Sequence, residues 1–212
     1  MGPSALPSGV VAASQLLGKP AAVEMVPSGI PELDLPRGAL TEICGAASSG
    51  RTSLLLSVLA QATSRLEVCA LVDTTDAFDP PSAAAAGVAL ERLLWVRCGG
   101  NVLHALTAAD WLAHGGGFGV VALDLGDVAS DQVRRISLAS WYRLRRAVEN
   151  TPAVLIALEP EPWAKSCSSL VLQLTRERIA WRGPLLGGVL VRVERRKPIR
   201  AASARFEARA VA

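Results

Sequence analysis

Short apolar runs alternate with longer helical segments from about residue 39 to residue 160. The apolar runs are typical of buried parallel strands, which carry apolar side chains on both faces. They lie at residues 39–45, 67–73, 92–98, 118–125 and 152–160. Between them, the pattern predicts helices at residues 52–65, 80–90, 101–117 and 130–150, the last one capped by Ser130 or Asp131.

After Pro160 the pattern changes to strands separated by short turns, at residues 169–183, 185–197 and 204–212. Alternating strands and helices followed by a strand-rich end indicate one α/β core. We therefore expect three layers, with a mainly parallel central sheet and antiparallel strands at the carboxyl-terminal end. Residues 1–24, rich in Ala, Pro, Gly and Ser, predict a flexible arm, and residues 25–212 predict the core.

Composition supports a folded, water-soluble chain. Half of the 212 residues are hydrophobic, but no apolar run is long enough to span a membrane, and no signal peptide is apparent. We therefore expect a cytoplasmic protein without membrane contact. The four cysteines form no C-x-x-C pair, and neither histidine stands at metal-ligand spacing, so reduced, buried thiols are expected.

The net charge of +3 is unevenly distributed. From Arg176 to the end the chain carries ten basic and three acidic residues, whereas the first 175 residues carry twelve basic and sixteen acidic ones. A basic end on an acidic body indicates a contact for DNA or an acidic partner. Solvated strand faces are the alternative. The candidate contact residues are Arg192, Arg195, Arg196, Lys197 and Arg200.

The strongest motif lies between the first long strand and the first long helix. It has the spacing G-x-x-x-x-G-x-T of a phosphate-binding loop, with Gly45, Gly50 and Thr52 in their places. Glycines let backbone amides surround a phosphate, and the following helix adds its positive end. The candidate nucleotide-binding residues are Gly45, Ala46, Ala47, Ser48, Ser49, Gly50, Arg51, Thr52, Ser53 and Asp124.

Arg51 replaces the lysine that usually reaches the β- and γ-phosphates. Its planar guanidinium either holds a phosphate or packs outward, leaving the loop as a plain connection. Asp124 ends the fourth strand, where such sites hold Mg²⁺. Thr52 and Asp124 are therefore the candidate Mg²⁺ ligands if a nucleotide binds.

The segments "LPRGALTEICGAASSGRTSLLLSVLAQA", "LVDTTDAFDPPSAAAAGVALERLLWVRC" and "ALTAADWLAHGGGFGVVALD" together resemble the ATPase core of bacterial RecA recombinases. The similarity extends over about residues 25–210. It implies a RecA-like P-loop core that binds ATP and Mg²⁺. In that family a glutamate activating the attacking water matches Thr75, and the glutamine sensing the γ-phosphate matches Glu159. We expect Glu159 to face the phosphate position and repel it, and we assign no catalytic residue.

The chain also has only short connections where RecA has its two DNA-binding loops. This pattern of losses resembles the ImuA (SulA-like) proteins of the bacterial DNA-damage response. That resemblance implies a non-recombinogenic accessory protein of SOS mutagenesis and translesion synthesis, binding RecA, polymerase components or DNA. Two alternatives stay open: an active DNA-dependent ATPase, with Asp76 replacing the lost base, and a cell-division inhibitor.

Overall fold

The computed structural model describes residues 23–30, 32–198 and 203–209. Its main feature is an eight-stranded sheet in the order β10-β9-β8-β3-β7-β6-β4-β5. The strands are β3 (Ala39–Cys44), β4 (Cys69–Asp73), β5 (Leu93–Arg97), β6 (Val120–Asp124), β7 (Val154–Glu159), β8 (Leu170–Arg182), β9 (Leu185–Lys197) and β10 (Ser203–Arg209). The strands from β8 to β5 run parallel, whereas β9 and β10 are antiparallel to their neighbours, which confirms the predicted fold.

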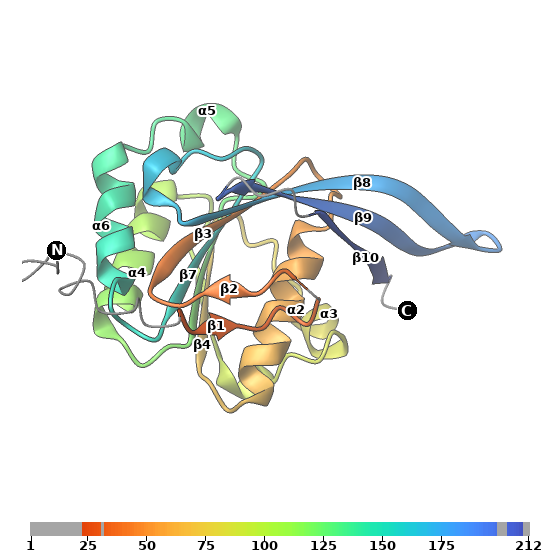
Figure 1. The fold of residues 1–212 in the computed structure, drawn as a ribbon, viewed down its shortest axis with the longest axis horizontal. Helices are drawn as coiled ribbons and strands as arrows, with labels where there is room; N and C mark the ends of the chain where they lie inside the picture. Colours follow the sequence, from red (N-terminus) through yellow and green to blue (C-terminus); the bar gives the residue numbers. More distant parts are fainter. Residues whose placement is uncertain (1–22, 31, 199–202, 210–212) are drawn as a thin grey trace, which may run out of the picture.

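Helices cover both faces of the parallel part of the sheet (Figure 1). The helices are α2 (Arg51–Ser64), α3 (Pro80–Ala85), α4 (Val102–Gly115), α5 (Ser130–Val133) and α6 (Leu138–Val148), with 3-10 turns η1 (Leu90–Arg92) and η2 (Lys165–Cys167). One core lies between the sheet and α2, and the other between the sheet and α4 and α6. A small antiparallel pair, β1 (Met25–Val26) and β2 (Leu35–Pro36), lies beside α2.

Three features depart from the predicted pattern. The expected helix at 130–150 is two helices, because the Ser137 side chain accepts the Ser140 amide at 3.1 Å and starts α6 there. The residue preceding α5 is Ala129, without a side-chain cap, so neither Ser130 nor Asp131 caps the segment. The helical pattern over residues 101–117 also predicts Trp111 in the core. It is instead 72% exposed, because Ala105 and Ala109 already face the sheet.

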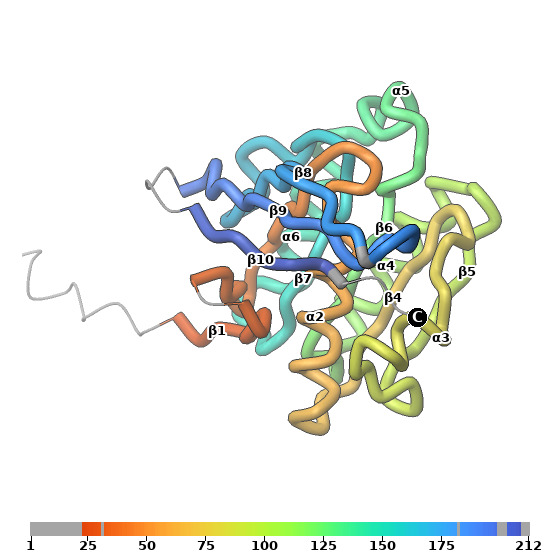
Figure 2. Tube along the Cα trace, turned by 90° about the vertical axis from the view of Figure 1, so that its right-hand side faces the viewer, coloured from red at the N-terminus to blue at the C-terminus, as the bar shows by residue number. Residues whose placement is uncertain are grey.

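The last three strands lie side by side over the amino-terminal end of α2 (Figure 2). Their far end is a hairpin of β8 and β9 that extends well past the helices (Figure 1). No helix in the described part of the chain is both long enough and apolar enough to cross a bilayer. Most of the predicted arm, residues 1–24, lies outside the described residues, as does Arg200.

Candidate functional site

The loop from Gly45 to Gly50 wraps tightly around the start of α2. Its backbone reverses at Ser48, with φ of 59°, and at Gly50, with φ of 94°. A Cβ atom on Gly45 would lie 2.6 Å from the Leu174 carbonyl oxygen, so only glycine fits there. The predicted loop residues Gly45–Ser53 are thus gathered around one helix terminus, where their amides can meet an anion.

The loop opens into a pocket of about 470 Å³ that lies against the carboxyl-terminal strands. Leu186, Gly188 and Val189 of β9 form its far wall, together with Ala208 of β10. A Cβ on Gly50 would come within 2.6 Å of the Val191 side chain. Gly50 therefore serves two needs, a left-handed turn and the close approach of β9.

Arg51 points inward, which excludes the outward-packing alternative. It is 7% exposed, and its Nη2 donates to the Gly126 carbonyl at 3.0 Å, with the Asp127 carboxylate 3.8 Å away. Its Nη1 is buried without a hydrogen-bond partner among the described residues. The guanidinium thus links the loop to the connection after β6 by a hydrogen bond, and its Nη1 donor remains available for a ligand.

Thr52 and Asp124, the candidate Mg²⁺ ligands, line the same cavity of about 80 Å³. Asp124 Oδ1 accepts the Gly126 amide at 2.8 Å, and burial is the main cause that raises the pKa of this carboxyl to about 6. A hydroxyl and a carboxylate are oxygen ligands of the kind Mg²⁺ prefers. The loop and these two residues therefore fit a Mg²⁺-bound phosphate.

The carboxylates at the end of β4 are already engaged. Asp73 is fully buried and accepts the amides of Ala77 and Phe78 and the Trp95 indole N–H. Asp76, the alternative base, pairs with Arg97 at 2.9 Å. Thr75 is exposed and cannot act as a base near neutral pH. Asp73 is therefore fully engaged, whereas Asp76 is held through Oδ2 and leaves Oδ1 without a partner among the described residues.

The expected orientation of Glu159 is wrong. Side chains alternate along a strand, and Leu158 already lines the cavity beside Asp124. Glu159 therefore points to the other face, where it is completely buried close to Glu42. Burial first, and then the Glu42 carboxylate, raise its pKa well above the usual range. Strand alternation in "LIALE" was the signal that could have shown this.

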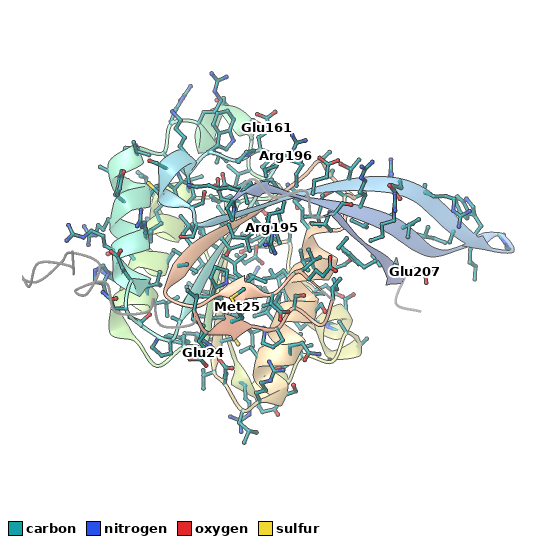
Figure 3. All side chains as sticks on the ribbon, in the orientation of Figure 1. Glu24, Met25, Glu161, Arg195, Arg196 and Glu207 are labelled. Carbon is teal, nitrogen blue, oxygen red and sulfur yellow. The ribbon has the colours of Figure 1, made fainter. Side chains whose placement is uncertain are left out.

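The basic residues of β9 do not form one open patch. Arg192 and Arg196 pair with Glu194 at 3.5 and 3.2 Å. Arg195 faces the other way, and its Nη2 donates to the Glu32 carbonyl at 2.9 Å. Figure 3 shows Arg195 and Arg196 on opposite sides of the strand.

Lys197 donates to the carbonyls of Lys165, Ser166 and Ser168 around η2. These partners could not be predicted, because Glu32 and the η2 turn lie far from Arg195 and Lys197 along the chain. The contact with DNA or a partner stays a prediction, with Arg192 and Arg196 as its most exposed described members.

Comparison with known proteins agrees with this architecture. The model of the RecA N-terminal domain matches residues 19–133, more than half of the chain. The chain is 42% identical to Protein RecA of Methylococcus capsulatus over 109 residues, 48% of this chain and 31% of that protein. It is 39% identical to Protein RecA of Symbiobacterium thermophilum over 155 residues, 63% of this chain and 44% of that protein.

The chain thus spans less than half the length of these relatives. Among solved structures, the crystal structure of the RadB recombinase superposes with a TM-score of 0.59. The match covers 81% of this chain and 87% of that one at 17% identity. At this identity the structural likeness establishes the fold alone.

Proposed function

This chain belongs to the RecA N-terminal domain family, and on that premise we propose that it is a non-recombinogenic accessory member. Its role is to bind RecA, translesion-polymerase components or DNA in the cytoplasmic response to DNA damage. The observation that carries this proposal is the engagement of the groups near the loop. Arg51 is bonded to Gly126, and Thr75 stands where the family's base is expected.

The connections after β6 and β7 give further support. They cover residues 125–129 and 160–169. The second connection is held in place because Lys197 donates hydrogen bonds to its backbone carbonyls at Lys165 and Ser166. Loops that close on DNA need length and freedom to move. Short, tied connections favour a protein that acts through its surface rather than one that pairs DNA strands.

We propose that the loop holds a nucleotide without splitting it. The amides of Gly45–Gly50 would bind phosphate, and Thr52 and Asp124 would hold Mg²⁺. The bound metal would supply charge neutralisation of the phosphates. The unused Nη1 of Arg51 offers a further donor on the protein side.

The decisive experiment measures binding and turnover separately. Purified full chain is titrated with Mg²⁺-ADP and Mg²⁺-ATP in a calorimeter, and phosphate release is then followed with single-stranded DNA and RecA present. We expect saturable binding that Asp124→Asn weakens, and no phosphate release beyond that of RecA and DNA in the absence of this chain. Release that Asp124→Asn abolishes would instead establish the DNA-dependent ATPase.

A further inference from the structure

The β8–β9 hairpin carries an apolar tip that is separate from the basic segment, and one member of this tip, Leu186, also lines the pocket beside the phosphate loop. Four large apolar side chains are exposed there, although the rest of the strands bury theirs. They are Ile179, Trp181, Leu185 and Leu186, with Trp181 64% and Leu185 70% exposed. Such a concentration on a projecting element marks an interaction site rather than ordinary surface (Figure 1).

The same hairpin has an open backbone edge. β8 pairs with β3 only through Leu170–Gln173, because β3 ends at Cys44. From residue 175 to residue 182 the strand pairs with β9 alone, and no other described segment makes a backbone hydrogen bond to it. The outer edge therefore presents unpaired N–H and C=O groups that can accept another strand, most regularly between Arg178 and Ala180, because β8 and β9 shift register between Arg176 and Arg178 and again between Ala180 and Trp181.

Charge on this edge selects the partner. Arg176 and Arg178 are exposed and have no acidic partner among the described residues, whereas Arg192 and Arg205 lie within reach of Glu177. Ile179 lies opposite Val189 and Trp181 opposite Leu186, so these pairs share one face. An added strand would meet apolar side chains on that face and arginine beside it.

We propose that the outer edge of β8 binds an extended segment of a protein partner that alternates apolar and acidic residues. The inference rests on the proposed function only in requiring a protein partner. A second copy fits poorly, because pairing two β8 edges would bring Arg176 and Arg178 near their own copies. Nucleic acid fits less well, because three of the four exposed apolar side chains are aliphatic and cannot stack on bases.

The test selects peptides of about twelve residues from a random displayed library on the intact chain. The winners are then measured on four proteins: wild type, Trp181→Ser, the double variant Arg176→Glu/Arg178→Glu, and Trp111→Ser. The last is the matched control, an exposed tryptophan on α4. All four substituted positions are exposed, so the variants should fold, and circular dichroism checks this.

We expect winners with alternating apolar and acidic residues. They should bind wild type and Trp111→Ser equally, and bind Trp181→Ser and the double variant at least about tenfold more weakly. Winners without acidic residues, or binding that survives both hairpin changes, would overturn the proposal. A dimer seen by light scattering that the hairpin substitutions abolish would also overturn it. So would oligo(dT) binding that Trp181→Ser abolishes, if no peptide depends on Trp181. None of these outcomes depends on nucleotide binding. The nucleotide titration therefore tests the loop proposal independently of the peptide experiment.

Discussion

Glu159→Gln should make the protein more stable at neutral pH, although it replaces a native carboxyl group. The Glu159 side chain is completely buried, and no described side chain donates a hydrogen bond to its carboxylate. The Trp163 amide favours the charged form only in part, because the pKa of the carboxyl is still raised. The Glu42 carboxylate lies nearby on the same face. Charge at Glu159 is therefore unfavourable, and glutamine keeps the shape without it.

The size of the effect follows from proton linkage. The pKa of Glu159 is raised well above the 4.5 of an unfolded glutamate, so above that pH the folded protein keeps a proton that the unfolded chain releases. Stability then falls as pH rises, by at most about 1.4 kcal/mol per pH unit. Between pH 4.5 and 7 the loss reaches at most about 3.4 kcal/mol, which is the largest gain that Glu159→Gln can produce at neutral pH.

Urea unfolding of wild type, Glu159→Gln and Glu161→Gln is measured between about pH 5 and pH 7. Glu161 is exposed two residues further on and is the matched control. The difference between Glu159→Gln and wild type should grow with pH, while Glu161→Gln follows wild type. A Glu159→Gln protein that is less stable at pH 7, or whose advantage does not change with pH, would refute the reasoning.

Three further outcomes are expected. Gly50→Ala should lower the free energy of unfolding in urea by roughly 1–3 kcal/mol, because the alanine would have to adopt a positive φ and its Cβ would clash with Val191. The control Gly115→Ala should change it little, because open space surrounds Gly115. Arg51→Ala should cost about 1.5–3 kcal/mol by the same measurement and speed hydrogen exchange at residues 125–129; unchanged exchange would show that the bond to Gly126 does not hold that connection. Replacing Arg195, Arg196, Lys197 and Arg200 with Ala should lower DNA affinity and its salt dependence; an unchanged slope would remove DNA from the proposal.

Most of the strand and helix order could be read from the sequence, because β3 to β7 are short apolar runs, α2, α4 and α6 are longer than ten residues, and α3 begins at proline. The break at Ser137 was missed, since an amphipathic period continues through it and only the local capping bond ends the first turn. Trp111 was misplaced because alanines, small enough to let α4 approach the sheet, take the inward positions.

At the site, the sequence predicted which residues lie together but not which groups their charged side chains contact. Gly45, Gly50, Thr52 and Asp124 were found because the motif fixes their spacing along the chain. The partner of Arg51 is a backbone carbonyl 75 residues away, and no pattern of side chains identifies a carbonyl. The same limit applies to Arg195 and Lys197, whose acceptors are also main-chain oxygens.

Strand β9 touches three regions that are remote from one another in sequence. Val191 lies against Gly50, Arg195 holds the carbonyl of Glu32, and Lys197 holds the turn at η2. The opposite end of this single strand is the exposed tip. A molecule bound at the tip would therefore act on the one strand that contacts the amino-terminal segment, the phosphate loop and the connection after β7.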